Sequence, residues 1–148
     1  MFFIANHPIY NHPLPEGHRF PMLKYELLPK QLLHEGTAEC TDFYSPDSID
    51  LSLVHAVHTV SYVKALTELT LDAKAVRSIG FPLSAALVER ELRIAQGTVV
   101  GCNHALENGI AFNIAGGTHH AFSDRGEAFC LLNDQAIAAQ YLINQKKC

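Results

Sequence analysis

The sequence predicts an α/β fold with a parallel sheet, and three observations support this class. Two short apolar runs, residues 2–5 and residues 110–114, have the length and composition of buried strands. Helical patterns lie between and after these runs, so the order is strand, helices, strand, loop and helix. The 148 residues are 48% hydrophobic and only 18% charged, which suits one domain in which helices cover a sheet and argues against disorder.

After the first strand, loops alternate with helical segments. Residues 6–21 contain four prolines and three histidines, too many breakers for a helix or a central strand, and are predicted as a loop. Residues 22–28 and 30–35 are helical in composition, and Pro29 is expected to divide them or to open the second helix. Residues 41–52 include a proline and three aspartates and are predicted as a second loop.

Helix-capping residues mark two further helices. Thr59 is a suitable N-cap for a helix that extends to about Leu71. Asn133 or Asp134 is expected to cap a last helix, which ends at about Gln145. The apolar stripe expected on the first of these helices consists of Val60, Val63, Leu66 and Leu69.

The middle of the chain predicts two helices separated by a glycine. Ser84 is expected to cap a helix over residues 85–96, and Gly97 is placed as the glycine that follows its C-terminus. Residues 98–106 then predict one more helix before the strand at 110–114. Close packing against a neighbouring element is a second explanation for this glycine.

The candidate functional stretch follows that strand. The adjacent glycines Gly116 and Gly117 allow unusual backbone angles or a close approach of another group. His119 and His120 come next, at the place where open α/β sheets put their chemistry, beyond the carboxyl end of a strand. Imidazole has an ordinary pKa of about 6.5, so the pair suits proton transfer. The alternative is a surface turn with two solvated histidines.

Three motifs in order along the chain resemble the histone deacetylase family. They read HPLPEGHRFPM from residue 12, LVHAVHTVSYV from residue 53 and GGTHHAFSDRGEAFCLLND from residue 116. This family comprises zinc-dependent amidohydrolases, including bacterial acetoin-utilisation and acetylpolyamine deacetylases, and the details are most similar to the class IV-like and bacterial branch. The resemblance implies an arginase/deacetylase-like fold of which residues 1–148 form the N-terminal part, truncated before the zinc ligands.

The resemblance also implies roles for individual residues. His120 matches the general base and acid of the family, and His119 matches its electrostatic partner. Phe129 and Gly117 are expected on the substrate side, with Phe129 forming an aromatic wall of the tunnel for acetyl-lysine. Arg19 matches an interior arginine near the path proposed for acetate release. Read without the resemblance, Phe129 is equally well a core side chain and Arg19 a solvated charge.

The expected cofactor is the zinc of a full-length parent protein. The family binds zinc through an Asp-x-His pair and a further aspartate, all located after the signature loop and its following helix, and no Asp-x-His occurs in these 148 residues. No metal ligand is therefore assigned within this chain. A catalytic zinc needs three protein ligands and an open position, so the chain alone is predicted to hydrolyse acetylamides poorly or not at all.

Composition restricts the partners. The resemblance implies an acetylated lysine, a polyamine or a small acetylamide as the substrate. A net charge of −4 predicts no general attraction to nucleic acid or to an anionic membrane. The sequence has no apolar run of about 20 residues and no signal peptide, and its cysteines are scattered, so a cytoplasmic protein with reduced thiols is expected.

Two other hypotheses belong to different classes. The chain could be a non-catalytic module derived from the deacetylase fold, which associates with itself or with a partner through an unpaired sheet edge. It could also be an unrelated metal-binding protein, because His55 and His58 could share a helical face and join His119 and His120. Packed or hydrogen-bonded histidines are the simpler explanation for His55 and His58.

Overall fold

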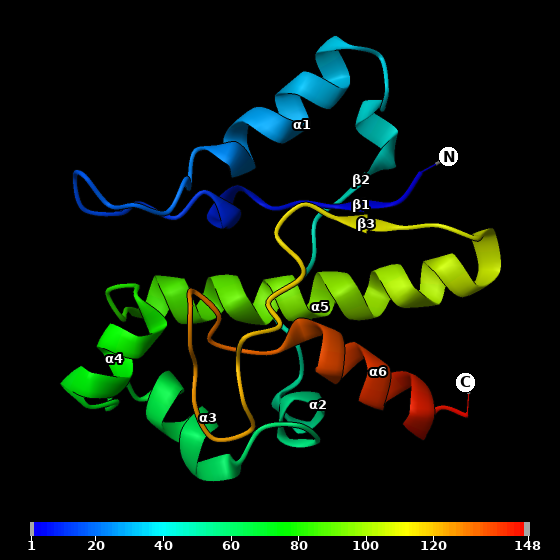
Figure 1. Cartoon of the computed structure of the whole chain (residues 1–148). Coiled ribbons are helices and arrows are strands. Elements are labelled where there is room, and N and C mark those ends of the chain that lie inside the picture. Colours follow the sequence, from blue (N-terminus) through cyan, green and yellow to red (C-terminus); the bar gives the residue numbers. More distant parts are fainter. Residues whose placement is uncertain (1, 147–148) are drawn as a thin grey trace.

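The computed structural model describes residues 2–146 and contains a small parallel sheet. Its strands are β1 (Ile4–Ala5), β2 (Phe43–Tyr44) and β3 (Phe112–Asn113), and their order is β2-β1-β3. The predicted parallel sheet is thus confirmed, with the first strand at its centre. Figure 1 shows α1 on one side of these strands and the long helix α5 on the other.

β2 corrects the prediction that residues 41–52 form a loop. This strand follows a short 3-10 helix, η2 (Cys40–Asp42), and pairs with the buried β1. A helix, α2 (Leu51–His55), also begins in the same segment. Both elements are short, and β2 has only two half-buried residues, so neither has a periodic pattern long enough to detect.

Helix α1 (Lys24–His34) corrects the expectation that Pro29 divides two helices. The proline lies inside one continuous helix, where its missing N–H removes one backbone hydrogen bond. Glu26 and Lys30 form a 2.6 Å ion pair across the proline, and Tyr25 anchors the preceding turn in the core. The exposed ion pair contributes little, so the helix around the proline is held mainly by the core contacts of Tyr25, whose ring lies under the Arg90 guanidinium.

Helix α3 (Val60–Thr67) matches the start of the helix predicted from the Thr59 cap but ends before the predicted end at about Leu71, and a separate helix, α4 (Ala73–Ile79), follows. The Thr59 cap is confirmed, because its hydroxyl oxygen accepts a hydrogen bond from the N–H of Tyr62 at 3.4 Å. The helix ends early because the backbone reverses after its last turn.

Residues around that reversal explain the difference. Leu69 has a positive φ of 58°, which no helix continues through, and the Asp72 side chain caps α4 instead. Of the expected apolar stripe, Val63 and Leu66 are buried, whereas Val60 and Leu69 are exposed. Tyr62 joins the buried residues, so the stripe is narrower and is shifted around the helix.

Helix α5 (Ala85–Asn108) is one continuous helix and corrects the prediction of two helices separated by Gly97. The Ser84 cap is confirmed by the hydrogen bond that its Oγ accepts from the N–H of Leu87, 3.1 Å away. Gly97 lies against the sheet, where an added Cβ would come within 2.9 Å of the Ala5 Cβ. The glycine thus serves close packing, the second of the two explanations, and does not end the helix.

Helix α6 (Asp134–Asn144) packs against α5 on the face turned away from the sheet (Figure 1). Asn133 caps it by accepting a hydrogen bond from the N–H of Ala136 at 3.0 Å, as predicted. None of the helices in residues 2–146 is long and apolar enough to cross a membrane. Cys148, one of the four cysteines expected to be reduced, lies outside the described residues.

The core contains a buried ion pair near the N-terminal end of α5. Arg90 and Glu91 are only 2% and 1% exposed and contact each other directly. The Arg90 Nε also donates to the carbonyl oxygen of Tyr10 at 3.0 Å, and its guanidinium lies over the Tyr25 ring. Burial raises the pKa of Glu91, and the neighbouring Arg90 opposes that rise. These contacts fix the N-terminal segment on α5.

Candidate functional site

His119 and His120 lie on an exposed turn of the loop that connects β3 to α6. Their ring centroids are 4.3 Å apart. The His119 Nδ1 is 2.8 Å from the carbonyl oxygen of Gly117, and a carbonyl can only accept, so Nδ1 carries a proton and donates it. In the neutral ring, Nε2 therefore keeps its lone pair and is free to accept a proton.

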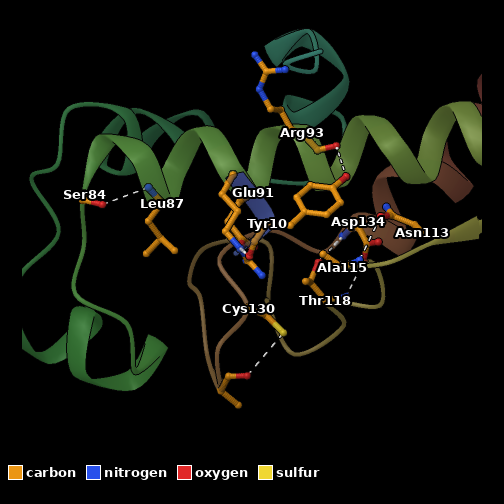
Figure 2. A network of polar contacts seen from close by, with 12 residues as sticks. Tyr10, Ser84, Leu87, Glu91, Arg93, Asn113, Ala115, Thr118, Cys130 and Asp134 are labelled. Atoms are coloured by element: carbon orange, nitrogen blue, oxygen red, sulfur yellow. Dashed lines mark hydrogen bonds and ion pairs between the residues drawn. The ribbon is translucent and has the colours of Figure 1, made fainter. Parts of the chain in front are cut away.

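Asp134 anchors the turn that precedes the histidines (Figure 2). Its carboxylate is fully buried and accepts hydrogen bonds from the N–H groups of Gly117 and Thr118 at 3.0 and 2.7 Å. It also accepts from the hydroxyls of Thr118 and Thr98, at 2.9 and 2.6 Å. Four donors satisfy the buried charge, so α5, α6 and the glycine turn are tied at one point.

The turn needs glycine at each of these two positions for a different physical reason. Gly117 has a φ of +91°, a region that favours glycine. At Gly116 an added Cβ would lie 3.0 Å from the Asn113 Cβ and 3.1 Å from the Asp134 Oδ2. The expectation that the glycines allow both an unusual backbone and a close approach is therefore confirmed.

Asn133 holds the same loop further along. Its side-chain N–H₂ group donates to the carbonyl oxygens of His119 and Ala121 at 3.3 and 3.2 Å. Its backbone N–H donates to the Nε2 of His58 at 3.0 Å. The sequence predicts Asn133 and Asp134 only as helix caps, and no local pattern shows that they also hold the histidine loop.

Phe129 belongs to an aromatic cluster on the N-terminal side of the molecule. Its ring centroid is 5.0 Å from those of Phe20 and Phe81 and 6.0 Å from that of His18. The ring is half-buried and packs partly against the hydrophobic core. The description as a core side chain therefore applies to part of this ring, and the role as a wall of a substrate tunnel stays a prediction.

Arg19 contacts this cluster from outside. Its guanidinium lies 4.9 Å from the centroid of the Phe129 ring, in a cation–π arrangement. The resemblance places this arginine in the interior, whereas here its residue is exposed. The surrounding loop is held to the cluster by His18, whose Nε2 lies 2.9 Å from the Gly80 carbonyl oxygen, so Arg19 rests on the aromatic surface.

The backbone at Phe129 is strained. Ala128 and Phe129 have positive φ values of 47° and 67°, which is uncommon for residues with a Cβ. Their N–H groups donate to the carbonyl oxygens of Ser78 and Ile79 at the end of α4, at 3.1 and 2.7 Å. Such strain persists where the surroundings determine it, and it clusters at functional sites.

Cys130 is a buried thiol rather than a nucleophile. Its Sγ donates a weak hydrogen bond to the carbonyl oxygen of Ala128 at 3.7 Å. Burial raises the pKa of this thiol, and the thiolate is the reactive form. The prediction of a packed thiol is confirmed.

The described residues do not form a metal site. Within residues 2–146 there is no group of three or more histidine, cysteine, aspartate and glutamate side chains that could surround an ion. His55 is exposed at the end of α2, whereas His58 lies beyond that helix, buried and bound to Asn133. The hypothesis of a four-histidine metal centre is therefore wrong for this part of the chain, and the residues present do not fit a zinc ion.

Comparison with known proteins decides the family. The model of the histone deacetylase domain matches residues 18–148, which is most of the chain. This chain belongs to the histone deacetylase family. The signature loop, Asn133 and Asp134 all lie inside the matched region of this deacetylase-family chain.

Similar proteins support the assignment. An uncharacterised protein of Picosynechococcus is 46% identical over 139 residues, covering 94% of this chain and 46% of the relative. The acetoin utilization protein AcuC of Bacillus subtilis is 33% identical over 105 residues, covering 66% of this chain and 27% of that protein. The deacetylase-family chain thus spans less than half the length of these curated relatives.

Solved structures confirm the fold. An HDAC homologue complexed with SAHA superposes with a TM-score of 0.82 at 22% identity, covering 97% of this chain and 41% of that one. An HDAC homologue from Aquifex aeolicus gives a TM-score of 0.81 at the same identity and coverage. The predicted deacetylase-like α/β fold is therefore correct.

Proposed function

We propose that this chain supplies the proton-transfer residues and one substrate wall of a zinc-dependent deacetylase. The parent protein hydrolyses an acetylamide bond of an acetylated lysine, a polyamine or a small metabolite. The observation that carries this proposal is the state of His119: its Nδ1–H is bound to Gly117, its Nε2 is free, and its ring lies 4.3 Å from that of His120. Family membership supplies the reaction class.

The two histidines perform the proton work of amide hydrolysis. A base must remove a proton from the attacking water, and an acid must protonate the leaving amine. His120 takes the base and acid role, and His119 stabilises the developing charge beside it. A zinc ion would polarise the carbonyl and activate the water, but the described residues do not form a site for one.

The aromatic cluster supports a substrate role for Phe129. A lysine or polyamine chain is thin and aliphatic, and apolar walls bind such a chain without competing polar contacts. Arg19 lies on the Phe129 ring. There its positive charge attracts the acetate ion as this product leaves the site. Gly117 contributes through its carbonyl, which orients His119.

Metal content and turnover of the isolated chain test the first part of this proposal. After zinc loading and desalting we expect less than about a tenth of an equivalent of bound zinc, and no turnover of an acetyl-lysine peptide. One tightly held zinc, lost on replacing His119 or His120, or turnover that a chelator abolishes would contradict the expectation that this chain lacks a complete site.

A chimera tests the second part. Residues 18–148 replace the matching part of the Picosynechococcus relative, which supplies the remaining half of the domain. We expect deacetylase activity that falls by about 10²-fold or more in His119→Ala and His120→Ala, because general acid–base catalysis contributes at least that much. His55→Ala, at an exposed residue far from the loop in sequence, is the control. A folded chimera whose activity is unchanged by both substitutions would refute the assigned roles.

One observation favours a second candidate function, a self-associating module. β3 is an edge strand of the described sheet, and its Phe112 is 49% exposed. Phe112 and Asn113 line a groove of about 340 Å³ between β3 and α1 and a smaller one of about 130 Å³ beside α5. An edge strand with apolar surface on both sides is suited to pairing with another chain.

A further inference from the structure

We propose that His58 is a positioning residue that sets the geometry of the His119–His120 loop. His58 is 1% exposed and lies between α2 and α3, far from the loop in sequence. Its Nε2 accepts the hydrogen bond of the Asn133 backbone N–H at 3.0 Å. His58 therefore fixes the residue that begins α6, and the loop ends at that residue.

Asn133 transmits this constraint to the histidines. Its side-chain N–H₂ group donates to the carbonyl oxygens of His119 and Ala121, which flank the peptide group of His120. The same side chain caps α6 through its Oδ1, which accepts from the Ala136 N–H. All the polar atoms of the Asn133 side chain are thus engaged, and a shift of its backbone must move the His119 carbonyl.

The other side of the His58 ring faces the middle of the loop. Because Nε2 accepts a hydrogen bond, the neutral ring carries its proton on Nδ1. Nδ1 is buried and faces the backbone carbonyls of Phe122 and Ser123, without a hydrogen bond of standard geometry. The next residue, Thr59, donates its N–H to the Ser123 carbonyl oxygen at 2.8 Å.

His58 and Thr59 thus hold the loop at two points. One contact is at the middle of the loop and the other is at its end, and the histidine turn lies on the chain between Gly117 and Ser123. Asp134 holds the beginning of the turn independently. A neutral imidazole with one defined tautomer suits this position, because a protonated ring has no acceptor for the Asn133 N–H.

This inference rests on the proposed function only for the statement that His119 and His120 are catalytic. Its structural content, a link from His58 through Asn133 to His119, can be measured in the chain without any turnover. Failure of the deacetylase proposal would leave this link intact, and failure of the link would leave the reaction class unaffected.

The first test measures the hydrogen bond directly in the unmodified chain by NMR. We expect a ¹⁵N–¹⁵N coupling across the bond between the Asn133 amide and the His58 Nε2. We also expect imidazole nitrogen shifts that show a proton on Nδ1 of His58 and on Nδ1 of His119. A His58 ring protonated on Nε2 would overturn the proposal, because that tautomer cannot accept this hydrogen bond.

The second test uses variants that separate positioning from packing. His58→Gln keeps an acceptor near the Nε2 position, whereas His58→Leu fills the space without one. Asn133→Asp keeps the cap on α6 and removes both donors to the loop. His55→Gln, three residues before His58 at the exposed end of α2, is the matched control.

Amide exchange and the His119 imidazole signals are the readouts. In His58→Leu we expect exchange at Asn133 to become about tenfold faster and the His119 imidazole nitrogen shifts to change because its carbonyl is no longer held, with partial rescue in His58→Gln. Asn133→Asp should change His119 in the same way while α5 amides keep their protection. If His58→Leu and Asn133→Asp are folded and leave the His119 signals unchanged, the proposal is wrong. If His58→Leu does not fold, Asn133→Asp alone decides.

Discussion

Two neighbouring backbone conformations decide where the Phe129 ring lies. Ala128 and Phe129 both have positive φ values, and their N–H groups satisfy two carbonyls at the end of α4. For a residue with a Cβ, the left-handed backbone region costs about 1–2 kcal/mol of conformational free energy relative to the right-handed helical region. The packing around the ring and the two hydrogen bonds must offset that cost.

Ala128→Gly tests this account of the strain. Glycine adopts a φ of 47° without the Cβ penalty, although it also raises the entropy of the unfolded chain. We expect a net gain of about 0.5 kcal/mol in the free energy of unfolding, measured by urea denaturation. A loss of 1 kcal/mol or more would mean that the Ala128 methyl group makes a contact of its own.

The buried imidazole of His58 makes the stability depend on pH. Burial lowers its pKa below the ordinary value of 6.5, so the folded chain keeps the ring neutral where the unfolded chain binds a proton. The free energy of unfolding therefore falls as the pH decreases from 6.5 toward the native pKa. The loss from this group is at most about 1.4 kcal/mol per pH unit.

His58→Gln isolates this effect from other titrating groups. Urea midpoints at about pH 7.5 and pH 5.5 should decrease more in the unmodified chain than in the variant. Glu91, whose pKa is raised by burial, acts in the opposite direction and is present in both chains. Equal decreases would show that His58 does not titrate differently in the folded and unfolded states.

At the scale of elements, α5 organises the molecule. It lies against β1 and β3 on one side and α6 on the other, and two of its glycines face these neighbours. At Gly97 an added Cβ would meet Ala5 at 2.9 Å and the Tyr10 hydroxyl at 3.1 Å. At Gly101 the nearest atoms, from Ala111 and Phe3, are 3.5 Å away, which is ordinary contact.

The two glycines therefore predict opposite effects of the same substitution. Gly101→Ala should stabilise the chain by about 0.5–1 kcal/mol, because alanine is the better helix former and the space exists. Gly97→Ala should destabilise it by about 1–3 kcal/mol, because the added methyl group separates α5 from β1. Thermal and urea unfolding of both variants measure the contrast. Similar shifts in the two would contradict the packing explanation.

The elements that the sequence predicts correctly are those with local signals. Ser84, Thr59 and Asn133 cap helices through their own side chains, and each is visible within four residues. Gly97 and Pro29 are misleading because contacts from distant residues decide their effect. The candidate site divides in the same way: the glycines and histidines are contiguous and predictable, whereas the partnership of His58 with Asn133 spans 75 positions.

At the scale of the whole molecule, β3 forms an edge of the described sheet. Phe112 is the exposed apolar residue of this strand and lines the grooves on both of its faces. An unpaired strand with apolar flanks pairs with other chains unless a charge opposes it. The self-associating alternative proposed above places its contact at this edge.

Phe112→Lys should therefore weaken association of the isolated chain. We expect the unmodified chain to show dimers or larger species in light scattering at high concentration, and the lysine variant to shift toward monomer. Val60→Lys, on an exposed apolar residue of α3, should change nothing. A monodisperse monomer before any substitution would exclude self-association through β3.

The central position of β1 has a consequence for synthesis in the cell. This strand emerges from the ribosome well before its partner β3, which lies more than 100 residues behind it in the chain. At about 5–20 residues per second, the ribosome needs roughly 5–20 s to make that partner. During this interval the apolar N-terminus has at most β2 beside it. The edge of β1 that pairs with β3 thus stays without its native partner until translation has passed β3.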